Sequence, residues 1–262
     1  MKNHHNNVYD AANAPKTRIV AALDEHLVAV LAPTDVMTSL KVVRDMNLMP
    51  KVIILDPWYN KGFGGVRTDY NEFILDLLRL SGEIAEHVFL WGFPEITAHF
   101  VDKLPPTLTL VAWLTWYYKN DPSVIRGWRS SQNACLHLSR PSAVLYPEHF
   151  LNQAQKDLQA RGKLRYMPGP TTVLEEPLPI QESFLTNPLA SQTDVIENAL
   201  LVGFVGKKER TGHPAQKPIG VIEKLILMTS KAGDLIVDPM MGSGTTAAAA
   251  LKNRRLANIG SF

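Results

Sequence analysis

The stretch that decides the fold is Leu235-Ile236-Val237-Asp238-Pro239-Met240-Met241-Gly242-Ser243-Gly244-Thr245-Thr246. Its first three residues form the short apolar run typical of a buried strand, and a glycine-bearing loop leads from them to a helix expected over 245–253. With a further strand expected over 256–259, the stretch forms a β-α-β unit. Glycines at this place let the backbone approach a ligand, and the helix N-terminus offers unpaired N–H donors. We interpret the stretch as a cofactor loop, while the same glycines also suit a purely structural turn.

The sequence of the loop argues against two common nucleotide-binding sites. It lacks the lysine of the G-x-x-x-x-G-K-[ST] phosphate loop, so a nucleotide triphosphatase is disfavoured. It also departs from G-x-G-x-x-G, so a dinucleotide enzyme is not favoured.

The rest of the chain predicts more of the same architecture. Strands are expected over 52–55, 88–91, 108–113 and 134–138, and helices over 72–86 and 218–229. We predict a single α/β domain over residues 1–262, with a Rossmann-like, doubly wound and mostly parallel sheet. Proline-rich, weakly periodic residues 146–210 are interpreted as an insertion.

Composition narrows the class of protein. The chain has 262 residues, 45% of them hydrophobic and 20% charged, which is typical of a globular domain. Its single Cys135 allows no intrachain disulfide and no cysteine-rich zinc site. We expect no membrane span and no signal peptide, and therefore a cytoplasmic protein. The formal net charge is only +2, but residues 117–165 carry eight Lys and Arg against three acidic residues, which suits either phosphate contacts or a solvated face.

A second cluster, Asp56-Pro57-Trp58-Tyr59, follows the strand expected over 52–55. A carboxylate, a carbonyl and aromatic faces side by side suit a planar base whose exocyclic amine must become nucleophilic. Accepting the two N–H bonds of that amine favours its tetrahedral, reactive form, and stacking holds a base swung out of its helix. An Asp-Pro pair also commonly just ends a strand.

Together, these segments carry a resemblance to a known family. Asp56-Pro57-Trp58-Tyr59 resembles the Asp-Pro-Pro-Tyr catalytic motif of amino-group DNA methyltransferases, and the stretch 238–246 resembles their Asp-Pro-Phe-x-Gly-Ser-Gly-Thr-Thr cofactor motif. His213-Pro214-Ala215-Gln216-Lys217-Pro218 is similar to their His-Pro-Thr-Gln-Lys-Pro segment. The order of the motifs, catalytic first and cofactor last, is that of the permuted β class.

The resemblance implies a function and a set of site residues. It implies transfer of a methyl group from S-adenosylmethionine to a base amine in duplex DNA, with adenine N6 preferred over cytosine N4 because the catalytic motif begins with Asp. It implies no metal, a prokaryotic or phage-encoded enzyme, and a target-recognition role for the insertion 146–210; a homodimer or a partner subunit stays open. The implied catalytic residues are Asp56, Pro57, Trp58 and Tyr59, and the implied cofactor contacts are Asp35, His213, Gln216, Lys217, Asp238, Pro239, Met240, Gly242, Ser243, Gly244, Thr245 and Thr246.

The chain departs from the family pattern at three places. Trp58 replaces the second proline of the catalytic motif, and Met240 replaces the phenylalanine of the cofactor motif. The strand after the cofactor loop usually ends with an acidic residue for the ribose hydroxyls, and residues 258–262 carry none. Two alternatives therefore stay open: a catalytically weakened homologue that binds DNA or a partner subunit, and a methyltransferase for RNA or a small molecule.

Overall fold

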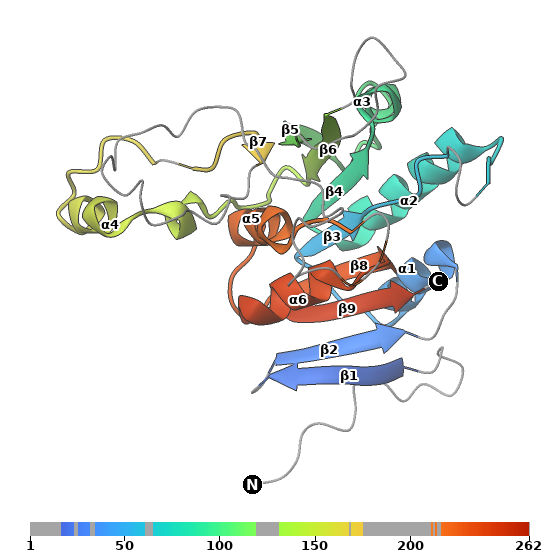
Figure 1. The fold of residues 1–262 in the computed structure, drawn as a ribbon, viewed down its shortest axis with the longest axis horizontal. Helices are drawn as coiled ribbons and strands as arrows, with labels where there is room; N and C mark the ends of the chain where they lie inside the picture. Colours follow the sequence, from blue (N-terminus) through green and yellow to red (C-terminus); the bar gives the residue numbers. More distant parts are fainter. Residues whose placement is uncertain are drawn as a thin grey trace, which may run out of the picture.

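The computed structural model describes residues 17–23, 26–31, 35–60, 65–118, 131–167, 169–174, 211, 213 and 216–261, with the backbone alone in 17–23, 26–31 and 258–261. In this part of the chain, nine strands form one sheet in the order β1-β2-β9-β8-β3-β4-β6-β5-β7 (Figure 1). The strands are β1 (Thr17–Leu23), β2 (His26–Leu31), β3 (Val52–Leu55), β4 (His87–Gly92), β5 (Thr109–Tyr117), β6 (Gln132–Ser139), β7 (Val173–Leu174), β8 (Leu235–Met241) and β9 (Leu256–Ser261).

The sheet is mostly parallel, as predicted. The central pairs β2–β9, β9–β8, β8–β3 and β3–β4 are all parallel, whereas β6 runs antiparallel to both of its neighbours, β4 and β5. The short strand β7 pairs in parallel with β5, and β1 forms an antiparallel hairpin with β2 at the other edge.

Helices cover both faces of the sheet, which makes the fold an α/β/α sandwich. The helices are α1 (Val36–Asp45), α2 (Tyr70–Ile84), α3 (Pro94–Thr97), α4 (Gln153–Ala160), α5 (Ile219–Thr229) and α6 (Thr245–Lys252), with 3-10 turns η1 (Ala98–Phe100) and η2 (Pro147–Phe150). Ile53 and Leu55 of β3 pack in one apolar cluster with α1 and α2, whereas Val52 and Ile54 pack in another with α5 and α6. The side chains of β3 thus alternate between two helical layers, and both faces of the strand are buried. For this reason every residue of 52–55 is apolar.

The elements expected from the sequence are present, with corrections to their bounds. The expected strand 108–113 extends to Tyr117, and the expected strand 235–237 continues to Met241, so Asp238 and Pro239 lie within β8 and not after it. The register of β8 against β9 shifts between Asp238 and Met241, which accommodates a residue without an N–H, Pro239, inside the strand. The hairpin β1–β2 and the helix α1 were not predicted from the sequence.

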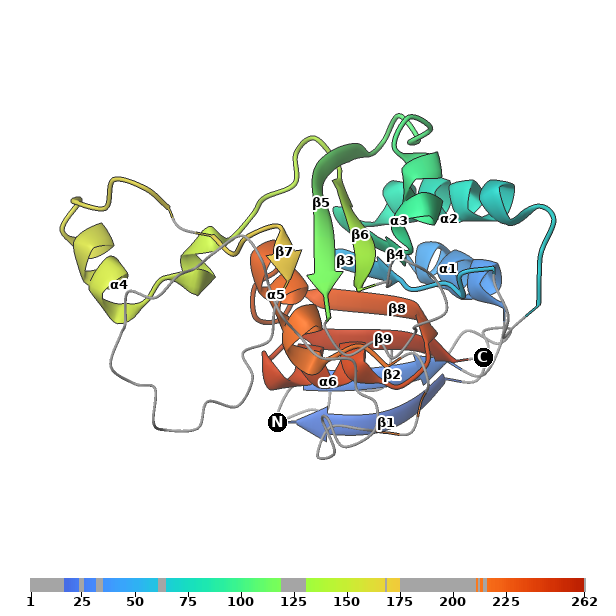
Figure 2. The same cartoon turned by 45° about the horizontal axis from the view of Figure 1, so that its top comes forward.

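Part of the expected insertion 146–210 is described. Its first segment carries η2 and α4, which lies apart from the sheet in both views (Figures 1 and 2). The base of this segment is fixed to the end of α5, where the N–H of Tyr146 donates to the carbonyl of Met228 at 2.8 Å. Residues 175–210 lie outside the described residues, as do Lys119, Arg126 and Arg129 of the basic stretch.

Two kinds of feature are absent from the described residues. No helix among them is long and apolar enough to cross a membrane. No cluster of three or more His, Cys, Asp or Glu side chains in this part of the chain is placed to hold a metal ion.

Candidate active site

The two sequence motifs meet at the point where the sheet changes winding direction. Strands β3 and β8 are neighbours and parallel, but α2 leads from β3 to β4 on one face, whereas α6 leads from β8 to β9 on the other. The carboxyl ends of β3 and β8 therefore form a topological switch point, which is where ligands bind in open α/β sheets.

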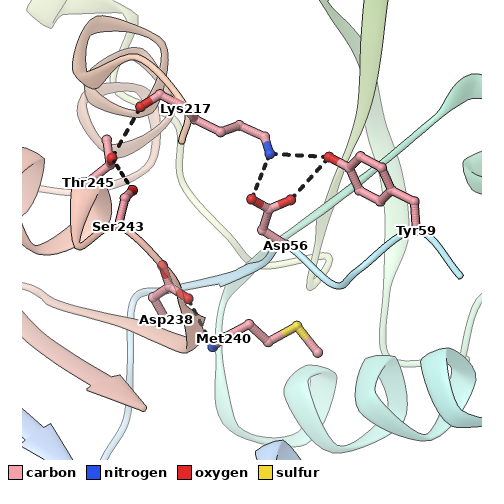
Figure 3. Close-up of polar contacts among 7 residues, drawn as sticks. All are labelled: Asp56, Tyr59, Lys217, Asp238, Met240, Ser243 and Thr245. Carbon is pink, nitrogen blue, oxygen red and sulfur yellow. Dashed lines mark hydrogen bonds and ion pairs between the residues drawn. The ribbon is translucent and has the colours of Figure 1, made fainter. Parts of the chain in front are cut away.

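Three polar side chains form a closed hydrogen-bonded ring at this switch point (Figure 3). Lys217 Nζ donates to Asp56 Oδ2 at 2.6 Å and to the hydroxyl oxygen of Tyr59 at 3.2 Å. The Tyr59 hydroxyl in turn donates to Asp56 Oδ1 at 3.2 Å. Burial, with a smaller contribution from the neighbouring Asp56 carboxylate, raises the pKa of Tyr59 well above its ordinary value, so its phenol stays a neutral donor.

Aromatic side chains pack against this hydrogen-bonded group. Lys217 Nζ lies 4.9 Å from the ring centroid of Trp91 in β4, within the range of a cation–π contact. Tyr59 packs edge-on against Phe93, which follows β4, with centroids 4.7 Å apart. Neither Trp91 nor Phe93 was predicted from the sequence as a site residue. Since carboxyl ends of adjacent parallel strands share one edge of the sheet, the position of Phe93 directly after a buried strand was the available signal.

Trp58 turns away from this group of side chains. Its ring packs against Tyr70 and Phe73 of α2, with centroids 5.6 and 5.8 Å away. Its carbonyl accepts a hydrogen bond from the Tyr70 hydroxyl at 2.9 Å, which fixes the backbone between Pro57 and Tyr59. Trp58 therefore anchors residues 56–59 on α2, while Asp56 and Tyr59 face Lys217.

The glycine loop after β8 leads into α6 through a left-handed residue. Gly244 has φ +79°, a left-handed conformation that favours glycine, and it caps the N-terminus of α6. A Cβ on Gly242 would lie 2.5 Å from His213 Nε2, so the absence of a side chain there lets the histidine ring pack on the loop. Hydroxyls line the start of α6, where Ser243 Oγ and Thr245 Oγ1 are 2.8 Å apart.

Asp238 and Met240 lie deeper than the loop itself. Burial raises the pKa of Asp238 to about 6, although hydrogen bonds from Thr246 and from the backbone N–H of Met240 act in the opposite direction. The N–H of Met240 donates to Asp238 Oδ1 at 3.0 Å. The Met240 side chain is 6% exposed and packs in the apolar cluster that includes α1 and α2. Figure 3 draws no hydrogen bond between Asp56 and the side chain of Asp238 or Met240.

The described residues of the 213–218 segment join the two loops. His213 packs on Gly242, and Lys217 reaches Asp56, while Thr245 Oγ1 donates to the carbonyl of Lys217 at 3.1 Å. The buried Gln216 accepts hydrogen bonds through Oε1 from the backbone N–H and the hydroxyl of Thr211, at 2.8 and 3.1 Å. Gln216 thereby shapes its own segment. Residues 214 and 215 lie outside the described part of the chain.

Asp35 serves as the N-cap of α1. Its Oδ1 accepts a hydrogen bond from the N–H of Thr38 at 2.9 Å, and the Thr38 hydroxyl donates to Oδ2. These hydrogen bonds lower the pKa of the Asp35 carboxyl. Its expected contact with a cofactor remains a prediction, since the described hydrogen bonds of the carboxylate are those of a helix cap.

Comparisons with known proteins show similarity to DNA methyltransferases. Residues 104–258, more than half of the chain, match the family model described as DNA methylase. The type II methyltransferase M.HpaI of Haemophilus parainfluenzae is 25% identical over 207 residues, which are 74% of this chain and 58% of that protein. M.ScaI of Streptomyces caespitosus is 51% identical over 47 residues, 18% of this chain and 16% of that protein. The chain thus aligns with less than two thirds of the length of these relatives.

Solved structures share the fold. A complex of M1.HpyAVI with SAM has a TM-score of 0.59 and 17% identity, covering 89% of this chain and 92% of that one. The cytosine-N4-specific PvuII DNA methyltransferase has a TM-score of 0.58 and 14% identity, covering 90% of this chain and 82% of that one. The family match, together with the carboxylate and the glycine loop at the switch point, shows that this chain belongs to the DNA methylase family of the N6/N4 amino class.

Proposed function

We propose that this chain transfers a methyl group from S-adenosylmethionine to the exocyclic amine of a base in duplex DNA, with adenine N6 as the preferred acceptor. The observation that carries the proposal is the meeting of Asp56 and the glycine loop at the switch point of the sheet. The Asp-first catalytic motif supports adenine. PvuII methyltransferase, which is cytosine-N4-specific, has a similar fold, and cytosine is therefore the second acceptor to test.

The residues around the glycine loop fit the cofactor. Gly244 caps α6 in a left-handed conformation, so the first N–H groups of that helix can donate to a polar ligand, and M1.HpyAVI, which has a similar fold, was solved with SAM bound. Residues 242–246 and His213 would hold the cofactor in this chain. When bound, S-adenosylmethionine supplies a methyl group on a positively charged sulfonium. The sulfur becomes neutral when it gives up the methyl group, so it is a good leaving group without a metal.

Asp56 and Tyr59 act on the acceptor amine. As the amine nitrogen attacks, positive charge develops on it, and the carboxylate of Asp56 stabilises that charge while accepting one N–H. Tyr59 supplies an aromatic face at the same edge, against which a base swung out of the duplex can stack. Flipping the base costs a few kcal/mol, and contacts elsewhere on the DNA must offset this cost.

The segment around α4 is placed to make such contacts. Four basic side chains on it are exposed, Lys156, Arg161, Lys163 and Arg165, against one acidic neighbour, Asp157. Its position apart from the sheet, where it projects from the rest of the fold, supports our assignment of residues 146–210 to target recognition.

The test is to express the protein in a methylation-deficient host and to map modified bases across the genome. We expect one base of one short sequence to be modified at its amino group. In single-turnover assays on that sequence, Asp56→Asn should slow methylation at least about 10²-fold, because it keeps the shape but removes the charge. Asp76→Asn, on the exposed face of α2, is the matched control and should retain the wild-type rate. Absence of any modified base, or a wild-type rate for Asp56→Asn, would refute the proposal.

A further inference from the structure

Lys217 is buried to a degree that is unusual for a lysine. The residue is 5% exposed, and its ammonium contacts Asp56, Tyr59 and the face of Trp91. Removing an ammonium from water is costly unless it is paired and hydrogen-bonded, and here an ion pair of 2.6 Å provides the partner. A cation retained at this cost, in contact with the catalytic carboxylate, needs a role there.

The backbone of Lys217 is fixed by the opposite half of the site. Its carbonyl accepts from Thr245 Oγ1 at 3.1 Å, and Thr245 belongs to the cofactor loop (Figure 3). The same residue thus touches the start of α6 through its carbonyl and the end of β3 through its ammonium. Figure 3 shows the side chain extending away from Ser243 and Thr245 and toward Asp56.

We propose that Lys217 is a positioning residue that orients the Asp56 carboxylate for the target amine, and that it is not a cofactor ligand. This inference rests on the proposed function. Lys217 holds Oδ2 through the short bond, whereas the hydrogen bond that Oδ1 accepts from the described residues is the longer one, 3.2 Å from the Tyr59 hydroxyl. Oδ1 is therefore the oxygen that exchanges Tyr59 for the N–H of the amine, while Lys217 keeps the carboxylate plane fixed.

Lys217 could change the methylation rate either through its charge or by orienting Asp56, and the two effects have opposite signs. A nearby ammonium disfavours positive charge developing on the amine, so its electrostatic contribution alone would slow the reaction. Its benefit must come from geometry, because a misplacement of about 1 Å can cost 10² in rate. Lys217→Met should therefore lower the single-turnover rate about 10²-fold, and Lys217→Arg, which keeps a cationic donor, should recover part of that loss.

Cofactor affinity is the readout that a cofactor ligand would move and a positioning residue would not. We expect the affinity of Lys217→Met for S-adenosylmethionine, measured by calorimetry, to stay within about twofold of the wild type. The matched control is Lys252→Met, which removes an exposed lysine from an ion pair with Glu223 at 3.0 Å and should change neither rate nor affinity.

A double-mutant cycle guards against a general loss of folding. If Lys217 acts only through Asp56, the Asp56→Asn and Lys217→Met double variant should be about as slow as Asp56→Asn alone. The double variant also leaves no unpaired charge, so its unfolding midpoint should lie above that of Lys217→Met.

The outcomes distinguish this inference from the proposed function. An active wild type with loss of cofactor binding in Lys217→Met would show a cofactor ligand and overturn the inference alone. So would an unchanged or faster rate in Lys217→Met, or additive losses in the double variant. A wild type that methylates no DNA would overturn the proposed function and this inference with it.

Discussion

Mild acid should destabilise this protein through two buried histidines, His87 in β4 and His137 in β6. His87 Nδ1 lies 3.1 Å from His137 Nε2, and His87 Nε2 lies 3.1 Å from the carbonyl oxygen of Val144. A carbonyl only accepts, so Nε2 of His87 carries the proton and its Nδ1 accepts from Nε2–H of His137. Protonation of His87 at Nδ1 therefore breaks the bond between the two rings, and protonation of either ring places a charge among buried groups.

The loss of unfolding free energy in mild acid follows from the pKa shifts of His87 and His137. Burial lowers the pKa of His87 to about 4 and that of His137 to about 3, from the ordinary 6.5. The Lys51 and Glu86 charges beside His87 act in opposite directions on it. Because both folded pKa values lie below the unfolded one, the unfolded state takes up protons first, and stability is lost as the pH falls below about 6.5. Between pH 7.5 and 5.5 each histidine should cost about 1.4 kcal/mol of unfolding free energy, about 3 kcal/mol for the pair.

Asp238 opposes this trend. Its folded pKa of about 6 lies above the ordinary 3.8, so protonation in the same window favours the folded state. That contribution is about 1 kcal/mol between pH 7.5 and 5.5, which leaves a net loss of about 2 kcal/mol. The histidine pair outweighs the carboxyl because two groups lose stability where one gains it.

Urea unfolding followed by tryptophan fluorescence at pH 7.5 and 5.5 measures this loss. His137→Gln keeps an amide donor toward His87 Nδ1 but cannot titrate, so the loss should shrink by about 1.4 kcal/mol. His99→Gln, at an exposed position of η1, is the control and should leave the loss unchanged. If His137→Gln shows the same loss as the wild type, the buried pair does not cause the acid sensitivity and the argument from its tautomers is wrong.

Two predictions concern the cofactor loop. Gly244→Val should weaken S-adenosylmethionine binding, because a β-branched residue is strained at φ +79°, whereas Gly244→Asn tolerates that conformation and should bind nearly as the wild type does. Gly233→Val is the matched control, with φ +88° in the turn before β8, and equal weakening there would contradict a local role of the loop. The backbone of Ser261 pairs with Met241 at the edge where the glycine loop begins, so we expect Ser261→Glu to bring a carboxylate to this edge, where it can accept hydrogen bonds from the ribose hydroxyls, and to tighten cofactor binding about tenfold. Ser261→Gln should give a smaller gain, and calorimetry that finds no gain for the glutamate would refute this placement.

Much of the central fold could be predicted because local patterns carry it. The apolar run 52–55 and the strand–glycine–helix stretch 235–246 contain their own signals, and both formed the expected elements. Their bounds were less predictable. Pro239 argues against a continuing strand, yet β8 reaches Met241, because a register shift against β9 removes the need for its missing N–H.

The features that could not be predicted depend on contacts between residues far apart in the sequence. Strand β2 pairs with β9, from Val28 with Ala257 to Leu31 with Gly260, so its place in the sheet depends on residues at the far end of the chain. The ion pair of Lys217 and Asp56 joins positions 161 residues apart, and no local pattern distinguishes it from a cofactor contact. The side chain of Trp58 could likewise not be assigned to α2 from its motif, since the approach of Tyr70 and Phe73 decides its direction.

The position of the 213–218 segment, however, follows from the order of the elements. Helix α5 directly precedes β8 and packs on the sheet face that α6 also covers. A helix that leads into a strand of a parallel sheet runs antiparallel to it, so α5 must begin at the edge where β8 ends. The residues just before α5 therefore lie at the carboxyl edge, beside the loop after β8 and, because β3 is the neighbour of β8, beside Asp56. Any side chain at position 217 would start from this place. A lysine there is long enough to reach the neighbouring strand end while its carbonyl stays with Thr245, which is why one residue can hold both halves of the site.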